Sequence, residues 1–531
     1  MIKQLVCLVA IAGSGCATDP TERQTPPGPS QGGNDVPGAG SPGSSAPGSS
    51  DPTGGPTDPS STPAPAVATG TWTRLASTPL SQAGFMQLLT DGTVIVSEIS
   101  TGKWFKLTPD VTGSYLHGTW SQIATMPTGY QPLYFGSGVL PDGRLMIEGG
   151  EYNKGSAVWT TLGAVYDPLA NKWTSVAPPA GWSSIGDASA TVLADGTYLQ
   201  SDCCSTKAAL LNPTTMAWTA TGAGKQGSSN DEESWTLLQD GTVLTVDCNN
   251  TVNLQASEIF TPSTGKWTLG PNTANKTCDI NSDGSGSHEN GPAILRYDGT
   301  VYAIGGTGHN DIYTVATKTW KAAPDSPNIG GQLDSADGPA VLMPNGNMLI
   351  ALSPGVFNAP THMFEWNGTA LTEVTAPPHA ASVPSYQNSF MLLPTGEVLL
   401  TDFSSDIELF TPTNRTPVTG VAPAITSISA ATLHPGSTFQ LTAQRMNGLS
   451  EAVAYGDDAH GATNYPIVRI TSTATGHVFY ARTFAHSNRS ISASETGTTS
   501  FTVPAATPLG AAQIQLVANG IPSAAVAITI N

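Results

Sequence analysis

Short apolar runs separated by a glycine turn recur through the middle of the chain. The turns are Asp91-Gly92, Asp142-Gly143, Asp195-Gly196, Asp240-Gly241, Asp298-Gly299, Asn345-Gly346 and Thr395-Gly396. Asp-Gly and Asn-Gly supply the positive φ angles of a two-residue hairpin. The glycines lie 45 to 58 residues apart, and a four-stranded propeller blade repeats about every 40–50 residues. The pattern predicts an all-β protein with a seven-bladed β-propeller.

A tryptophan follows a later strand of most repeats: Trp173, Trp218, Trp267 and Trp320. One indole at a fixed place in each repeat fills the wedge between neighbouring sheets, so we assign these residues to inter-blade packing. The last repeat, ending at Pro412, lacks this tryptophan, whereas Trp72 lies at the start of the region. We therefore expect the N-terminal strand to complete the last blade and to remove its exposed edge.

The repeats end near residue 420, and alternating strands follow from Pro423. They run over 425–428, 438–441, 467–470, 501–503 and 514–517. Short strands at such spacing are typical of a β-sandwich. The sequence predicts a propeller over 70–420 and an immunoglobulin-like β-sandwich over 421–531.

The first 69 residues have the composition of a targeting segment and a linker. Lys3, an apolar run over 5–12 and Gly13-Ser14-Gly15-Cys16 predict a lipoprotein signal (1–16) with a lipid on Cys16, and an ordinary secretory signal is the alternative. Residues 17–69 are rich in Pro, Gly and Ser and cannot bury a core, which predicts a disordered tether. We expect an exported cell-envelope lipoprotein of the outer membrane or surface, or a secreted protein.

Charge narrows the choice of partners. The 531-residue chain carries a net charge of −19, which would be repelled by nucleic acid and by an anionic membrane surface. We expect a small-molecule or carbohydrate ligand, no nucleic acid, and membrane contact only through the lipid.

Export permits disulfide bonds. Beyond the signal, the cysteines are Cys203, Cys204, Cys248 and Cys278. Cys203 and Cys248 each lie seven residues after their turn glycine, so a bridge between the third and fourth blades is the leading expectation, with Cys278 in a second bridge. A metal-thiolate cluster is the alternative.

The repeats and the C-terminal region together resemble the galactose oxidase and glyoxal oxidase family. These copper-radical oxidases combine a seven-bladed kelch propeller with an immunoglobulin-like, early set domain. The resemblance covers roughly residues 72–531 and includes Gly520-Ile521-Pro522-Ser523 before the last strand. It implies the same order of two folds.

The resemblance also implies a copper site of two tyrosines and two histidines, one tyrosine being joined to a cysteine. Tyr134 and Tyr386 match the tyrosines, and His486 resembles the histidine of a C-terminal loop that enters the axis. Gln387 stands in place of the other histidine, and no cysteine stands near Phe85, where the family has one. A carboxamide is a poorer Cu(II) ligand than imidazole. We therefore do not expect the Cys-Tyr thioether, and Tyr134, Tyr386 and His486 are the remaining metal candidates.

Polar residues begin the inner strand of several repeats, nine or ten positions before the turn glycine. They are Tyr134, Asp187, Asp231, Glu232, Glu289, Asn290, Asp337, Tyr386 and Gln387. In a propeller these positions ring the mouth of the central channel, so the sequence predicts an acidic ligand-binding cup. Crowded carboxylates need a cation or hydrogen-bond donors among them. A wet mouth without a ligand is the alternative, and Asp231-Glu232-Glu233 also suits a solvated acidic turn.

These observations leave two functions open. The first is binding of carbohydrate or another polar ligand at the acidic mouth, with or without a cation; Ca²⁺ suits oxygen ligands, and copper requires a histidine. The alternative is a copper-dependent oxidoreductase with an altered site. The ligand, the metal and the oligomeric state are not determined by the sequence.

Overall fold

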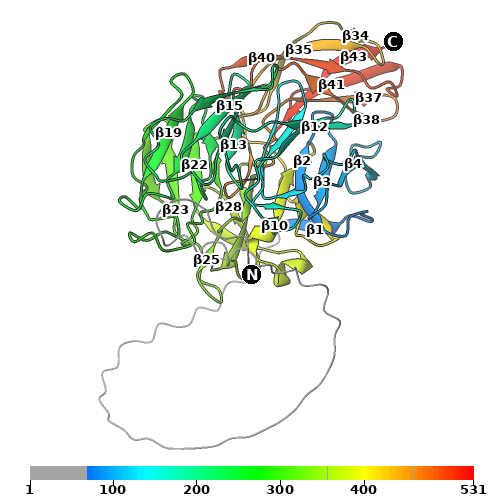
Figure 1. Cartoon of the computed structure of the whole chain (residues 1–531). Coiled ribbons are helices and arrows are strands. Elements are labelled where there is room, and N and C mark those ends of the chain that lie inside the picture. Colours follow the sequence, from blue (N-terminus) through cyan, green and yellow to red (C-terminus); the bar gives the residue numbers. More distant parts are fainter. Residues whose placement is uncertain (1–68, 356, 459) are drawn as a thin grey trace, which may run out of the picture. The chain divides into compact units, whose positions relative to one another are not determined.

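The computed structural model describes residues 69–355, 357–458 and 460–531, and these residues form mainly β-strands (Figure 1). The predicted signal with Cys16 and the tether up to residue 68 lie outside the described residues. Two short 3-10 turns, η3 (Pro378–Ser382) and η4 (Ser385–Gln387), lie among the described residues. Among the residues described, no helix is long and apolar enough to cross a bilayer. The predicted all-β class is confirmed.

Each predicted hairpin joins the first two strands of its own antiparallel sheet. The first four sheets are β2 (Ala83–Leu88), β3 (Val94–Glu98), β4 (Trp104–Thr108), β5 (Thr119–Gln122); β7 (Gly136–Val139), β8 (Leu145–Glu148), β11 (Gly163–Asp167), β12 (Lys172–Val176); β13 (Ala190–Val192), β14 (Tyr198–Ser201), β15 (Ala208–Asn212), β16 (Ala217–Thr221); and β17 (Thr236–Leu237), β18 (Val243–Val246), β19 (Ser257–Thr261), β20 (Lys266–Leu269).

Three further sheets continue the series. They are β21 (Ala293–Leu295), β22 (Thr300–Ile304), β23 (Asn310–Thr314), β24 (Thr319–Ala322); β26 (Pro339–Leu342), β27 (Met348–Pro354), β28 (His362–Trp366), β29 (Leu371–Val374); and β30 (Ser389–Leu392), β31 (Val398–Thr401), β32 (Ile407–Pro412), β1 (Gly70–Arg74). Short strands β6 (Pro132–Leu133), β9 (Tyr152–Asn153) and β10 (Ser156–Ala157) form a small extra sheet, and β25 (Leu333–Asp334) pairs with β27.

The turns differ in type from the predicted two-residue hairpin. In the first of them, Gly92 has φ of 76° and donates its backbone N–H to Leu89 at 3.0 Å, whereas Asp91 is absent from the residues with positive φ. Asp91 instead accepts hydrogen bonds from the backbone and side chain of Thr93. A turn of this kind with a left-handed glycine is the usual longer hairpin loop. The aspartate therefore acts through its side chain, and only the glycine supplies the positive φ.

The N-terminal strand completes the last sheet, as predicted. β1 pairs antiparallel with β32, and the ring of Trp72 lies 4.9 Å from that of Phe410. The Trp72 indole donates to the carbonyl of Thr375 in the preceding sheet at 2.8 Å. Trp218 likewise donates to Ala177 of the preceding segment. These indoles therefore pack between sheets rather than around a ligand.

The C-terminal region forms two sheets packed face to face. One contains β33 (Ala424–Ile428), β35 (Thr438–Gln444), β40 (Thr496–Thr502) and β39 (Thr483–Phe484); the other contains β34 (Thr432–Leu433), β43 (Val526–Ile530), β41 (Gly510–Ala518), β37 (Ile467–Ser472), β38 (Val478–Ala481) and β42 (Ile521–Pro522). Leu441 and Phe501 of the first share a buried core with Val468 and Ile514 of the second. This region is therefore a β-sandwich (Figure 1).

Residues 449–458 and 460–465 of this C-terminal region run among the inner strands of the preceding sheets. Their strand β36 (Val453–Tyr455) pairs with β26. Glu451 accepts hydrogen bonds from Thr191 in β13 and from the backbone of Leu237 in β17, and Tyr465 donates to Leu88 in β2 at 2.5 Å. A single segment can reach the first strands of so many sheets only where these strands converge. We call residues 449–458 and 460–465 the axial segment.

Candidate functional site

Three acidic side chains meet at the tip of the axial segment. Carboxylate oxygens of Glu232, Asp337 and Asp457 all lie within 4.8 Å of one another. The residues are buried, with 8%, 1% and 1% of their surfaces exposed. Glu232 and Asp337 come from the fourth and sixth repeats and both lie nine residues before a turn glycine, whereas Asp457 comes from the axial segment. We call these three residues the axial carboxylates.

The backbone at these positions has an unusual conformation. Tyr134, Glu232 and Asp337 have φ values of 55°, 55° and 51°. Left-handed φ is uncommon for residues other than glycine and is found where the surrounding structure imposes it. All three hold the same position in their repeats, where the chain turns into the inner strand.

The axial segment approaches the acidic residues closely at a glycine. Gly456 has φ of 31°, and a Cβ built on it would lie 2.4 Å from Oδ1 of Asp337. Any side chain here would clash with that carboxylate. Next to it, the carbonyl of Asp457 accepts a hydrogen bond from the Ser189 hydroxyl at 2.7 Å. Glycine thus allows the tip to reach the axial carboxylates.

The acidic run Asp231-Glu232-Glu233 is divided among three environments. Asp231 is partly exposed, and one of its carboxylate oxygens lies within 4.8 Å of Asp187 and of the Cys203 sulfur. Glu232 belongs to the axial carboxylates, and Glu233 is fully buried. The structure therefore does not support the solvated acidic turn that the sequence also allowed.

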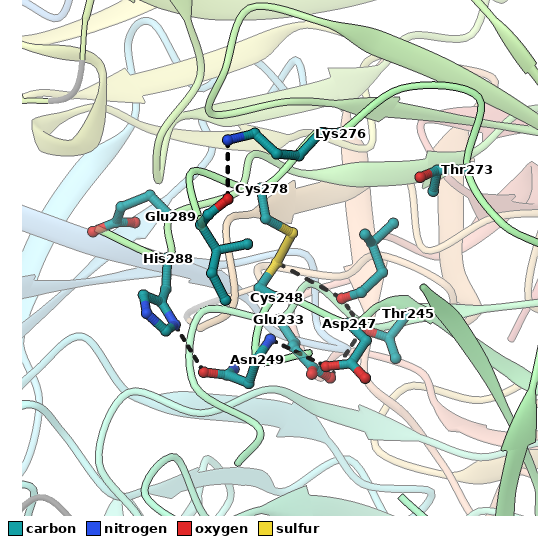
Figure 2. The surroundings of a disulfide bond; sticks show 12 residues. Glu233, Thr245, Asp247, Cys248, Asn249, Thr273, Lys276, Cys278, His288 and Glu289 are labelled. Atoms are coloured by element: carbon teal, nitrogen blue, oxygen red, sulfur yellow. Dashed lines mark hydrogen bonds between the residues drawn. A yellow bond between two sulfur atoms is a disulfide. The ribbon is translucent and has the colours of Figure 1, made fainter. Parts of the chain in front are cut away.

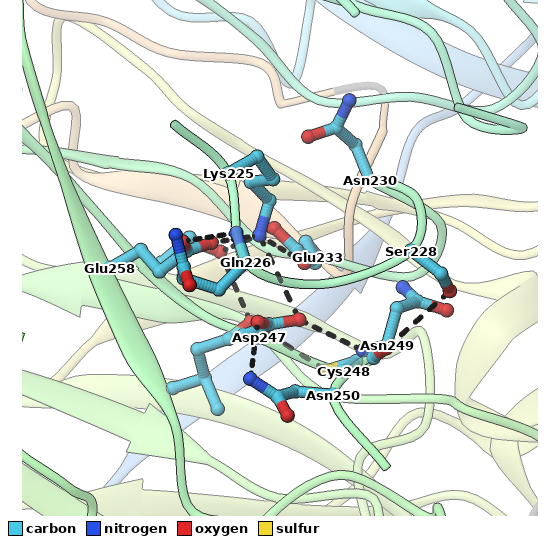
Figure 3. A network of polar contacts seen from close by, with 12 residues as sticks. Lys225, Gln226, Ser228, Asn230, Glu233, Asp247, Cys248, Asn249, Asn250 and Glu258 are labelled. Carbon is cyan, nitrogen blue, oxygen red and sulfur yellow. Dashed lines mark hydrogen bonds and ion pairs between the residues drawn. The ribbon is translucent and has the colours of Figure 1, made fainter. Parts of the chain in front are cut away.

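Glu233 is held by a buried ionic network with one lysine at its centre (Figure 3). Lys225 Nζ lies 2.8 Å from Glu233 and 3.7 Å from Asp247, and it also pairs with Glu258. Burial lowers the pKa of Lys225, but these three carboxylates raise it by more, so the lysine stays charged. Burial raises the pKa of Glu233 well above its ordinary value. The network fixes the residue that follows Glu232 in the sequence.

Aromatic rings enclose one side of the axial segment. Tyr455 stacks on Tyr134 with ring centroids 6.4 Å apart, and Phe85 lies 5.2 Å from Tyr455 and 5.5 Å from Tyr134. The Tyr455 hydroxyl donates to the carbonyl of Tyr386 at 2.6 Å. Burial, followed by the charge of Tyr134 and nearby acids including Asp458, raises the pKa of Tyr455 well above its ordinary value. The Tyr455 phenol is therefore neutral at physiological pH.

The remaining candidates lie around this centre. Gln387 is partly exposed and donates from Nε2 to the Tyr386 hydroxyl at 3.3 Å. The backbone carbonyl of Asn290 accepts a hydrogen bond from the backbone N–H of Asp337 at 3.3 Å. Glu289 is buried and is among the charges that raise the Tyr455 pKa. The structure thus places the candidates from several repeats near the axial segment.

The disulfide bonds differ from the leading expectation. The structure pairs Cys203 with its neighbour Cys204, and Cys248 with Cys278, so the expected Cys203–Cys248 bridge between blades is wrong. The second bond joins the end of β18 to the segment that precedes β21 (Figure 2). All four cysteines are therefore occupied, which excludes the thiolate cluster in this structure.

The Cys248–Cys278 bond supports the segment that leads to the mouth. Beside it, the backbone N–H of Asp279 donates to the Glu289 carbonyl at 3.0 Å. The His288 ring contacts the Asn249 side chain at 2.9 Å (Figure 2). His288 thus has a side-chain partner that ties the segment to the loop after β18.

His486 is not where the resemblance implied. Its backbone N–H donates to Pro141 at 3.0 Å, and its Nδ1 contacts the Thr499 hydroxyl at 2.9 Å. Pro141 adjoins the Asp142-Gly143 turn, at the opposite end of β7 from Tyr134. The histidine is therefore held at the turn end of the sheet, and its assignment as a metal ligand beside Tyr134 is wrong.

The histidine on the axial segment is His460. It is buried, and its Nε2 lies 3.3 Å from the Asp457 carbonyl. Burial lowers its pKa to about 4, so the imidazole is neutral at physiological pH. Sequence analysis missed His460, Tyr455 and Asp457, because their spacing does not follow the repeat. The signal that the sequence offers here is the acidic pair Asp457-Asp458.

The donor set does not suit a copper-radical site. Every cysteine among the described residues is in a disulfide, so none is available for a thioether to Tyr134. The ring of Phe85 packs against Tyr134 instead. The axial segment carries one imidazole, that of His460, and the carboxylates of Glu232, Asp337 and Asp457 meet at its tip. Oxygen donors of this kind suit hard cations better than Cu(II).

Comparison with known proteins supports the fold alone. Neither a known protein family nor any curated protein matches the sequence. Among solved structures, a fungal alcohol oxidase of the AA5 family in complex with copper is similar at a TM-score of 0.51 and 15% identity, over 87% of this chain and 100% of that one. A streptogramin B lyase matches at a TM-score of 0.46 and 12% identity, over 65% of this chain and 98% of that one. The extracellular domain of a putative one-component system from B. thetaiotaomicron matches at a TM-score of 0.44 and 10% identity, over 88% of this chain and 58% of that one. At such identities the first likeness indicates a related β-propeller architecture and does not transfer an activity.

Proposed function

We propose that this protein binds a carbohydrate or another polyol-rich ligand at the acidic mouth around the axial segment. The observation that carries the proposal is the meeting of Glu232, Asp337 and Asp457 within 4.8 Å. Asp231, which precedes Glu232 in the sequence, and Gln387 are partly exposed, and we propose that they form a rim beside the buried acids. Hydroxyl groups of a ligand would donate hydrogen bonds to the rim, and a few fixed polar groups are what gives such sites their orientation.

Export fits this role. Two disulfide bonds are typical of proteins that fold in an oxidising compartment. We propose that the chain is exported and is held at the cell envelope by a lipid on Cys16. Replacement of Cys16 by alanine should move the protein from the membrane fraction to the soluble fraction, whereas an unchanged distribution would contradict the anchor.

Binding to a glycan array tests the proposed function. The purified protein should be retained on at least one class of glycan, and Asp231→Ala and Gln387→Ala should each reduce retention by at least about tenfold, because each removes a rim acceptor for the ligand hydroxyls. Asp325→Ala is the control, since Asp325 pairs with His309 and its side chain is 57% exposed. Equal retention of all four proteins would contradict binding at the mouth.

A copper-dependent oxidoreductase is the second candidate. It is favoured by the neutral imidazole of His460 on the axial segment. Tyr455 of the same segment stacks on Tyr134 and donates to the backbone carbonyl of Tyr386, the two tyrosines that the family resemblance singled out. The absent thioether and the oxygen-rich surroundings disfavour it. Stoichiometric copper in the purified protein, with an optical radical band after oxidation, would support the oxidoreductase and contradict a function in binding alone.

A further inference from the structure

The axial carboxylates have the separation that a shared cation requires. Two oxygens bound to one Ca²⁺ ion, each at about 2.3–2.6 Å, can lie at most about 4.6–5.2 Å apart. The oxygens of Glu232, Asp337 and Asp457 meet this limit pairwise, since all lie within 4.8 Å. The three carboxylates can therefore share one Ca²⁺ ion.

A second observation points to a ligand at this place. Oε2 of Glu232 is buried and has no hydrogen-bond partner among the described residues. The side chain is more than nine-tenths buried, and the carboxylate lies with those of Asp337 and Asp457. A buried oxygen without a hydrogen-bond partner keeps the full cost of losing its contact with water. A cation would remove this cost.

We propose that Glu232, Asp337 and Asp457 bind a Ca²⁺ ion. All three donors are carboxylate oxygens, which suit a hard cation. Because Asp457 lies on the axial segment while the others lie on the sheets, the ion ties the C-terminal region to the inner strands. This inference deepens the proposed function, since the ion would also offer free coordination positions to ligand hydroxyls, but its binding can be measured without a glycan.

Calorimetric titration of the chelator-treated protein with Ca²⁺ tests the site. We expect one equivalent to bind and to raise the melting temperature. Glu232→Gln, which keeps the volume and removes the charge, should weaken Ca²⁺ binding by at least about tenfold, because affinity follows the number of charged ligands. In the presence of a chelator, Glu232→Gln should melt no lower than the wild type, because the substitution relieves repulsion between the carboxylates. Asp325→Asn is the charge-matched control and should bind Ca²⁺ like the wild type.

The outcomes separate the ion from the ligand. Unchanged Ca²⁺ affinity in Glu232→Gln, or no binding at millimolar Ca²⁺, overturns the site. If Glu232→Gln fails to fold, Asp337→Asn takes its place, and the same loss is required. Ca²⁺ binding together with a negative glycan array supports the ion and contradicts the proposed function. Glycan retention that is indifferent to chelator and to Glu232→Gln supports the function and overturns the ion.

Discussion

Lys225→Met should lower the free energy of unfolding by about 3–5 kcal/mol, the cost of leaving buried charges without their partner. The Lys225 side chain is 1% exposed, and those of Glu233, Asp247 and Glu258 are fully buried. Removal of the one cation leaves three carboxyl groups crowded in a medium of low dielectric constant. Methionine keeps most of the volume, so the effect reports charge rather than a cavity.

Urea unfolding with an exposed lysine as the control measures this effect. Lys321 lies on the exposed part of β24, so Lys321→Met should change the stability by less than about 0.5 kcal/mol. The double variant Lys225→Met/Glu233→Gln should recover part of the loss, since it removes one of the unpaired acids. A loss below 1 kcal/mol in Lys225→Met would contradict the network.

Replacement of Cys248 and Cys278 by alanine should cost about 3–4 kcal/mol. The bond closes a segment of 30 residues, and the loss follows from the larger freedom of the unfolded chain. Cys203 and Cys204 are adjacent, so their bond closes almost no loop and their double alanine variant should lose far less. Each variant removes one disulfide bond, but the two differ in how much conformational entropy the unfolded chain gains.

Thermal unfolding of both double variants without reductant checks the contrast. The Cys248/Cys278 variant should also bind any mouth ligand less well, because the 278–289 segment carries Glu289. Equal losses of stability in the two variants would show that loop closure is not the source of stabilisation.

The sequence predicted the repeated features and missed the unique ones. Each turn glycine and the closing strand at Trp72 follow from local rules of hairpin formation and edge protection, which act at every repeat. The places of Tyr134, Glu232 and Asp337 also follow, since the same offset from a turn leads to the same end of an inner strand. The periodic pattern therefore predicts both the fold and the site residues that lie on the repeats.

The axial segment could not be found in this way. Its place depends on Gly456 meeting Asp337 and on β36 pairing with β26, which are contacts across more than one hundred residues. Neither a period nor a composition signals such a contact. For the same reason, the sequence favours His486 over His460. Equal offsets from the turn glycines also favour a Cys203–Cys248 bond, whereas Cys203 is bonded to its neighbour Cys204.

The central claim is that acids from the sheets and from the axial segment form one cation-binding site beside Tyr455. Terbium luminescence tests it most directly, because Tb³⁺ replaces Ca²⁺ at oxygen sites and its emission is strongly enhanced by energy transfer from a nearby excited aromatic ring. One equivalent should give emission that Ca²⁺ displaces, that Glu232→Gln abolishes, and that Tyr455→Phe weakens without loss of Tb³⁺ affinity. Absence of sensitised emission, or emission equally strong in Glu232→Gln, would contradict the account.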